Sequence, residues 1–304
     1  MRFNPRELHI KDAHSYEIIH ARGIHKRDKD PLVPTRFVAP GSTAGTIGHE
    51  HHRLRREYIN NFFSKQAVMR MEHVIQDKVD KMAQRFEDAH LNSTVVPLHI
   101  VFGAMAADVV TQYCFGTPLG ISDNPDFNNP ISESLNELTE AISALRFFPL
   151  LLSLVRKTPS HWLQWVSVQT RSVLELQNWI RSRTAECMGR AAPTNGLDSK
   201  DQCSRGTILD ALMASDVPAE EKRPDRLEDE IFVLVNAGME TTARSLAVTF
   251  FHLAKNEETM LKLRRELKQL MPFPTSPATW LQLEKLAYLV VSSQMVRRHP
   301  TWFH

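Results

Sequence analysis

The stretch Ala237-Gly238-Met239-Glu240-Thr241-Thr242 decides the fold, because it lies inside the longest helical segment of the chain. From Arg226 to about Lys255 the sequence contains no proline, and its one glycine is Gly238. A helix of about 30 residues is about 45 Å long, whereas the mean helix has about 11–12 residues. We expect a helix this long, apolar on most sides, to cross the centre of the domain.

The same stretch contains three residues that suit a ligand-binding or catalytic site. Gly238 costs about 1 kcal/mol relative to alanine in a helix, but its missing Cβ lets a flat group approach the backbone. Thr241 can donate to the carbonyl of Ala237 and open the helix locally, and Glu240 places an acid beside it. This arrangement suits oxygen-ligand binding and proton delivery next to a planar cofactor. The alternative is a helix kink packed against a neighbour with Glu240 at the surface, and spacing alone favours it.

Helical patterns extend outward from this segment in both directions. Asp225 followed by Glu228 predicts a capping-box start, and Gly116 predicts a C-terminal stop for an apolar helix before it. Ser64 predicts the N-cap of one amphipathic helix that continues to Phe86. The remaining helices are predicted over Arg53–Phe63, Leu98–Phe115, Ile131–Ala144, Trp162–Met188 and Glu257–Leu270. Residues 1–48 are predicted to be irregular, with a short strand at 7–10.

Composition restricts the classes of protein. The chain has 304 residues, with 37 Lys+Arg against 35 Asp+Glu, so its net charge of +2 gives no global argument for nucleic-acid binding. Only 11 residues are glycine, which disfavours a sheet-rich fold. Three cysteines at scattered positions exclude a disulfide framework and a cysteine-rich zinc site. The sequence therefore predicts a mainly α protein of one large domain or two small ones.

Targeting signals are not evident in the sequence. The most apolar run, Phe147 to Val155, is far shorter than the roughly 20 residues that a bilayer requires. The first residues lack the apolar region of a signal peptide. We therefore expect no membrane span in this chain and a cytoplasmic location by default.

A second constellation is the basic segment Gly48–Arg56. His49-Glu50 resembles the start of a zinc-protease motif, but the position of the second histidine is occupied by Arg53, so the metal site is not predicted. Arg53, Arg55 and Arg56 suit phosphate or carboxylate binding. A solvated basic face is the commoner outcome of such a run.

The ordered set of motifs resembles the cytochrome P450 family, in particular its membrane-anchored fungal type. Ala237-Gly238-Met239-Glu240-Thr241-Thr242 resembles the oxygen-activation motif of that family's central helix, helix I. Further resemblances, to the first strand region and to helices C, E, J and K in chain order, are carried by Phe3–Ile10, His52–Arg56 with Phe62–Ser64, Ala107–Gly116, Leu263–Leu267 and Leu283–Leu289. The resemblance implies a P450 fold with little β structure.

The resemblance also implies roles for individual residues and for haem as the cofactor. Thr241 would bind the iron-bound oxygen and relay protons with Glu240 as its acid partner, and Ala237 and Gly238 would lie over the haem face. Arg55 and His51 fall where the family binds a haem propionate. The implied partners are a small apolar substrate and a P450 reductase, with no nucleic acid. Full-length relatives are anchored in the endoplasmic reticulum membrane.

Two family features are missing from the 304 residues. The buried Glu-x-x-Arg pair would need a glutamate at position 295. This chain has Met295 there, three residues before Arg298. The haem-ligand pattern Phe-x-x-Gly-x-x-x-Cys-x-Gly is absent, so no axial cysteine is predicted, and residues from about 290 to 304 depart from the family. We therefore expect one incomplete P450-like domain over 1–304, truncated at both ends and catalytically inactive as written.

Three functions are considered on this basis. The first is a P450-like monooxygenase fragment whose parent oxidises a small apolar secondary metabolite. The second is a non-catalytic helical protein that binds a partner or ligand. The third, a nucleic-acid-binding helical protein, rests only on Arg53–Arg56.

Overall fold

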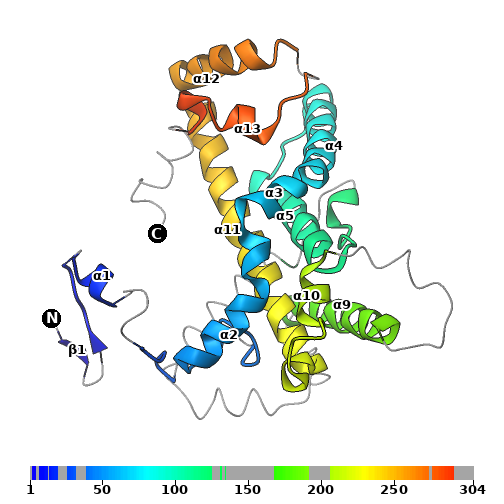
Figure 1. The fold of residues 1–304 in the computed structure, drawn as a ribbon. Coiled ribbons are helices and arrows are strands. Elements are labelled where there is room, and N and C mark those ends of the chain that lie inside the picture. Colours follow the sequence, from blue (N-terminus) through cyan, green and yellow to red (C-terminus); the bar gives the residue numbers. More distant parts are fainter. Residues whose placement is uncertain are drawn as a thin grey trace.

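The fold was analysed in a computed structural model, which describes residues 2–4, 7–12, 14–19, 26–31, 39–124, 131, 134, 168–191, 206–273 and 276–290. Most of the helix predicted over 131–144 lies outside the described residues, as do Cys203, Met295 and Arg298. Figure 1 shows a mainly helical molecule in which one long helix crosses the centre. This confirms the predicted fold class.

The N-terminal part carries the only strands among the described residues. Strands β1 (Arg2–Asn4) and β2 (Glu7–Leu8) form an antiparallel pair, with Arg2 opposite Leu8 and Asn4 opposite Glu7. The helical elements that follow are α1 (His14–Ile19), α2 (His49–Asn60), η2 (Asn61–Phe63), α3 (Lys65–Arg70), α4 (Glu72–Leu91), α5 (Leu98–Phe115), η3 (Ile121–Asp123), α9 (Val168–Ala191), α10 (Ile208–Leu212), η4 (Ala219–Lys222), α11 (Pro224–Lys255), α12 (Glu257–Leu270) and α13 (Trp280–Leu283).

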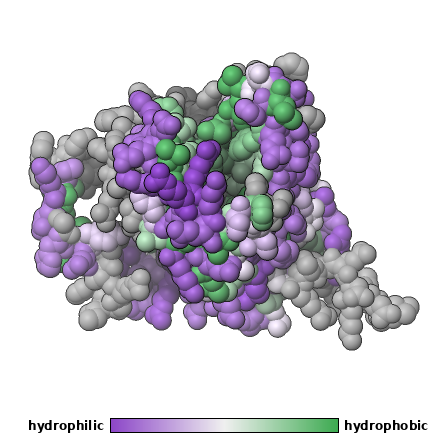
Figure 2. Space-filling model, turned by 90° about the horizontal axis from the view of Figure 1, so that it is seen from above, coloured by the Kyte–Doolittle hydropathy of each residue, from purple (hydrophilic) through white to green (hydrophobic). Residues whose placement is uncertain are grey.

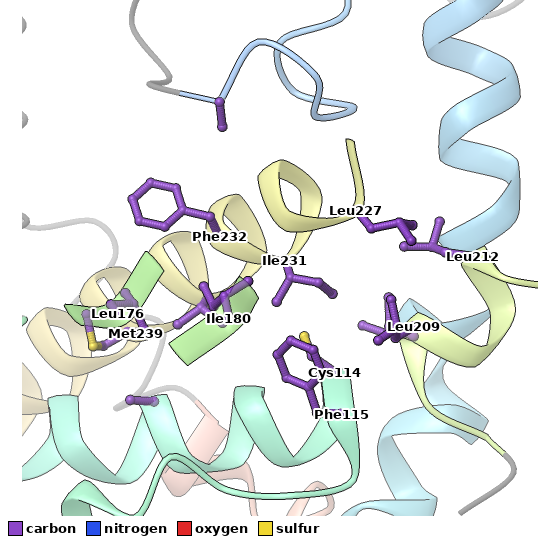
Figure 3. Close-up of a cluster of buried hydrophobic side chains, with 14 of the residues drawn as sticks. Cys114, Phe115, Leu176, Ile180, Leu209, Leu212, Leu227, Ile231, Phe232 and Met239 are labelled. Carbon is purple, nitrogen blue, oxygen red and sulfur yellow. The ribbon is translucent and has the colours of Figure 1, made fainter. Parts of the chain in front are cut away.

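Helix α11 has 32 residues and organises the core. It packs most extensively on α5 and also on α9, while α12 follows after a sharp turn at Asn256 (Figure 1). Figure 3 shows Ile231 of α11 pointing toward Cys114 and Phe115 of α5, while Leu227 of α11 lies toward α10. The other buried side chains of this cluster come from α9 and α10, namely Leu176, Ile180, Leu209 and Leu212. A helix apolar on several sides is therefore placed where three neighbours cover it.

Helix α5 is the one described helix that is long and apolar enough to cross a membrane. In this structure 61% of its apolar window is buried inside the protein, as expected of a core helix. Gly116 ends it with φ 75°, a left-handed conformation that favours glycine, and this confirms the predicted stop.

Two predictions about helix ends are wrong. Ser64 caps a helix as predicted, since its side chain accepts from Ala67 N, but that helix ends at Arg70 and α4 begins at Glu72. Met71 has ψ −2° and its N–H donates to Val68 O three residues back, which interrupts the α-helical ladder.

The capping box predicted at Asp225 is not formed. Helix α11 begins two residues earlier, with Arg223 as the N-cap, no side-chain cap bond and Pro224 in the first turn. Proline at this place loses nothing, because the first amide groups of a helix have no partner inside it. Asp225 instead pairs with Arg223, and Glu228 lies 3.4 Å from Arg181 of α9.

Candidate functional site

The central turn of α11 carries the motif that suggested chemistry. Thr241 Oγ1 donates to the carbonyl of Ala237 at 2.6 Å, which confirms the predicted back-bond. Ser245 and Thr249 repeat the same contact to the carbonyls four residues before them, each at 2.7 Å. The sequence analysis missed these two, although their i, i+4 spacing from Thr241 was a readable signal. Hydroxyls therefore form a stripe along one side of the helix.

This stripe begins on the exposed side of α11. Ala237 and Thr241 are exposed, whereas Met239 and Ala243 of the same two turns are fully buried. The middle of the central helix therefore has one packed face and one open face. Backbone and hydroxyl groups at the open face are accessible to a ligand.

Gly238 does permit a close approach, but the approaching group is protein. A Cβ at this position would lie 2.7 Å from Val110 Cγ2 of α5. The missing side chain thus allows the two helices to pack closely at this point. Contact of Gly238 with haem stays a prediction.

Glu240 lies at the interface with α5 rather than on the open face. Its Oε1 is 3.4 Å from His99 Nε2 and 4.0 Å from Arg244 Nε, and its side chain is 19% exposed. The alternative that placed Glu240 at the surface is therefore wrong. His99 and Arg244 hold this acid one residue away from Thr241.

A second cluster, called here the Glu221 cluster, consists of Glu221, His51, Arg55 and Arg226. Glu221 is 4% exposed, and its carboxylate oxygens lie 2.6 Å from His51 Nε2, 2.8 Å from Arg55 Nε and 2.9 Å from Arg226 Nε. Burial alone would raise the pKa of Glu221, but hydrogen bonds from the three basic side chains lower it to about 2. Glu221 is therefore charged at neutral pH.

The Glu221 cluster continues into the segment before α2. Arg226 Nη2 lies 2.9 Å from Glu230 Oε2, which accepts from both Thr43 N and Thr43 Oγ1. Arg55 Nη1 donates to the carbonyl of Gly41 at 2.9 Å, and Gly41 N donates to Asp229 at 2.7 Å. The first turns of α11 thus fix the segment 39–48. The sequence analysis missed these acids, although Arg226 and Glu230 at i, i+4 in an apolar helix were a signal.

These contacts change how His51 and Arg55, the predicted propionate ligands, are interpreted. Both are bound to a carboxylate of the protein itself, so neither is free for a ligand carboxylate in this structure. Arg55 is also turned inward, with 11% of its side chain exposed. The solvated face of three arginines, on which the nucleic-acid hypothesis rests, is therefore reduced to Arg53 and Arg56.

The next pair on α2 lies in a different environment. His52 and Arg56 have the same i, i+4 spacing, and the described residues show no carboxylate in ion-pair contact with either. Burial lowers the pKa of His52, and the positive charges of Lys29, Arg56 and His49 lower it further. The lowered pKa means that His52 is protonated less readily than an unperturbed histidine.

Cysteine does not supply a metal ligand in the described residues. Cys114 is fully buried between α5 and α11 (Figure 3), and this burial raises the pKa of its thiol. Cys187 is also buried. The described residues contain no group of three or more His, Cys, Asp or Glu that could hold a metal ion. The prediction that this sequence carries no axial cysteine stays a prediction.

The family description Cytochrome P450 matches residues 10–292. The chain is 43% identical over 292 residues to the cytochrome P450 monooxygenase aflU of Aspergillus parasiticus, covering 95% of this chain and 56% of that protein. It is 35% identical to conidiogenone synthase PchP450 of Penicillium rubens, covering 95% and 56%, and 34% identical to the cytochrome P450 monooxygenase TRI4 of Fusarium sporotrichioides, covering 95% and 54%.

A crystal structure of a cytochrome P450, CYP102L1, superposes with a TM-score of 0.63 at 14% sequence identity. The superposition covers 90% of this chain and 58% of the other, and it shows the fold. The chain spans about half the length of the curated relatives it matches. With most of its residues matched by the family description and with fungal monooxygenases among its relatives, the chain belongs to the cytochrome P450 family.

Proposed function

We propose that the chain forms the oxygen-side half of the haem site of a P450 monooxygenase that oxidises a small apolar secondary metabolite. The observation that carries the proposal is the open face of α11, where exposed Ala237 and Thr241 lie beside the held acid Glu240. The relatives support the class of reaction, because they are fungal P450 monooxygenases. The substrate and the position oxidised belong to the proposal.

The residues on this side fit haem. Ala237 presents only a methyl group at the exposed face, which leaves room for a flat ring. His51 and Arg55, the predicted propionate ligands, are bound to Glu221 in this structure, and their contact with haem stays a prediction. When bound, haem supplies the oxygen-activating chemistry of the family.

Thr241 and Glu240 divide the work of moving protons. Thr241 Oγ1 donates to Ala237 O, so its lone pairs remain available to accept a proton or a hydrogen bond at the open face. Glu240 lies at the adjacent position and is held by His99 and Arg244, near solvent at the edge of α5. Protons would therefore reach Thr241 from the α5 side of the helix.

The described residues do not match the cysteine-ligand side of the family's haem site in the same way. In the family a cysteine thiolate donates electron density to iron, and a buried thiol with a raised pKa such as Cys114 does not supply it. We propose that the 304 residues alone do not carry out oxygenation. A reductase partner and a cytoplasmic location stay predictions.

The test is the absorbance spectrum of the purified 304-residue chain with haemin, reduced under carbon monoxide. We expect a Soret band without the red shift of the thiolate type. Binding of haemin to the open face should move this band from its position in free haemin. Thr241→Ala, exposed and on that face, should alter this spectrum, and Thr259→Ala on α12 is the matched control. A red-shifted band of the thiolate type, or hydroxylation above a haem-only control, would show that the inactivity is wrong.

A second candidate function is a non-catalytic helical binding protein. It is favoured by large apolar side chains at the surface, and Figure 2 shows such side chains gathered around a hollow. Phe251 is 57% exposed and Phe273 is 71% exposed. A monodisperse chain that does not change the haemin spectrum would support this function, whereas a chain that binds haemin and precipitates without it would contradict it.

A further inference from the structure

Helix α4 is held to the protein with little burial of its own side chains. None of its 20 residues, all of which the structure describes, is buried, whereas α5, on which it packs, has buried residues along its whole length. The apolar side of α4 is half-buried, and its Phe86 meets Phe102 of α5 edge to face, with ring centroids 6.4 Å apart. Separating α4 from α5 therefore exposes no fully buried side chain of α4 itself.

The basic side of α4 contacts the turn at 120–124, which follows α5. Lys78, Lys81 and Arg85 lie at positions i, i+3 and i+7, on one side of the helix. Lys81 pairs with Asp123, and Arg85 Nη2 donates to the carbonyl of Asp123 at 2.8 Å. The hydrogen bond from Lys81 lowers the pKa of Asp123, and the charges of the other two cations lower it further. Charge therefore binds α4 to this turn.

Asp108 of α5 lies beneath the same turn and is fully buried. Its Oδ1 accepts from Gly120 N at 2.7 Å and from Ile121 N at 3.0 Å, and its Oδ2 accepts from Ser122 N at 3.2 Å. Lys78 of α4 adds a cation, with its Nζ 3.0 Å from Oδ2. One carboxylate thus binds both the turn and α4.

The amide donors decide what happens to Asp108 when Lys78 moves away. Loss of one partner of a buried ion pair is normally costly, because the other charge stays buried and unpaired. Asp108 keeps its three amide donors, since these belong to the turn and not to α4, and such donors stabilise a carboxylate as an anion. Movement of α4 therefore leaves no buried charge without a partner.

Both ends of α4 adjoin breaks in the helical backbone. At its start Met71 interrupts the helix that begins at α3, and Glu72 is fixed by accepting from Trp280 N of α13. After its end Ser93 has φ 51°, and the exposed loop that follows leads to α5. Figure 1 shows α4 at the outer edge of the molecule. The start of α4 is thus anchored beside a break, and its far end adjoins an exposed loop.

We propose that α4 is a hinged cover of α5, latched to the turn at 120–124 by Lys78, Lys81 and Arg85, and that it opens at Met71 while the rest of the fold stays intact. Opening uncovers the side of α5 that carries Phe102, which is 1% exposed in the closed form. The open form is a minor state, at about 0.1–10% of molecules. This inference goes beyond the proposed function and does not depend on haem.

The test is native-state hydrogen exchange of the full 304-residue chain, followed by mass spectrometry on peptides from α4, α5 and α11. Local opening exposes little new surface, so exchange in α4 should not change with low concentrations of urea, whereas exchange in α5 and α11 should accelerate with urea. We expect α4 to exchange at least about tenfold faster than α5 without urea. Equal protection of α4 and α5 with the same dependence on urea would overturn the inference.

Variants of Lys78 test the latch itself. Lys78→Met keeps the length of the side chain but removes its charge, so exchange in α4 should accelerate by about tenfold while α11 is unchanged. Lys78→Arg keeps the charge and should restore slow exchange. Lys262→Met is the matched control, because Lys262 is paired with Glu258 within α12 and should leave α4 unchanged. If Lys78→Met accelerates exchange in α4 and α11 equally, Lys78 supports the whole fold and the latch is refuted.

Ionic strength gives a second, independent measurement on the unaltered chain. The pair of Lys81 with Asp123 lies at the surface, where salt screens charge. Raising NaCl from about 0.05 M to about 0.5 M should accelerate exchange in α4 by about threefold and leave α5 unchanged. Exchange in α4 that does not respond to salt would contradict a latch made of charges.

Discussion

The first turns of α11 and its middle turn differ in how completely their polar groups are bound. At the first turns Arg226 and Glu230 are 3% and 2% exposed, and both are tied to other elements. At the middle turn Thr241 is exposed and binds only its own helix. Buried ion pairs therefore hold the first turns of α11, whereas the centre of the same helix has an exposed face.

This difference indicates which part stabilises the fold and which part is available for a ligand. A buried charge costs several kcal/mol when its ion-pair partner is removed. An exposed hydroxyl that bonds within its helix costs little to remove. We therefore expect substitutions near the start of α11 to reduce stability and those at the middle turn to affect ligand binding.

The largest expected effect is that of Arg226→Ala. The substitution leaves Glu221 and Glu230 buried without their shared cation, so the free energy of unfolding should fall by about 3–5 kcal/mol. The matched control is Arg223→Ala, whose arginine is exposed and should change stability by less than about 0.5 kcal/mol. Both values come from urea unfolding followed by circular dichroism. Equal effects of the two substitutions would contradict the importance of the buried cluster.

The second effect is a loss of stability at low pH. The pKa of Glu221 falls from 4.5 to about 2 on folding, so its charged form contributes about 3 kcal/mol. Because the folded pKa is the lower one, this contribution is complete above pH 4.5 and is lost as the pH falls toward 2. The unfolding free energies of the wild type and of Glu221→Gln should therefore converge between these pH values. A constant difference down to pH 2 would refute the assignment.

The third effect concerns the contact between α11 and α5. In Gly238→Ala the gain in helix propensity, about 1 kcal/mol, opposes a Cβ placed 2.7 Å from Val110 Cγ2. Valine is stiff in a helix and cannot swing away, so the clash should prevail and destabilise by about 1–2 kcal/mol. Adding Val110→Ala should restore stability, so that the double variant is at least as stable as Val110→Ala alone. Independent, additive effects would rule out the contact.

The sequence predicted those elements whose signals are local. The length of α11, the αL glycine at Gly116 and the bond from Thr241 to Ala237 follow from propensity and short-range geometry, and all three are present. The end of α3 at Met71 has no comparable local signal, because the apolar spacing continues through it. The resemblance predicted the family to which the chain belongs, and the comparisons confirm that family.

The sequence could not show which basic pair of α2 faces the protein. That choice depends on Glu221, which lies 166 residues from Arg55, and a shift of one residue around a helix leaves the composition of the motif unchanged. The contact of Gly238 with Val110 was not predicted for the same reason, since Val110 is distant in the sequence. Contacts over long separations decided both sites.

The smallest expected change in stability is that of Thr241→Val, which removes one exposed hydroxyl and should alter the free energy of unfolding by less than about 0.5 kcal/mol. Thr111 of α5 offers a matched control, because its hydroxyl also donates four residues back, to Ala107 O at 2.8 Å, but is fully buried. Thr111 Oγ1 additionally accepts from Leu119 N, so Thr111→Val leaves a polar group without a partner and should cost about 1–3 kcal/mol. If Thr241→Val is instead the more destabilising of the two, the middle turn of α11 stabilises the fold, and the interpretation of the open face as a ligand site is wrong.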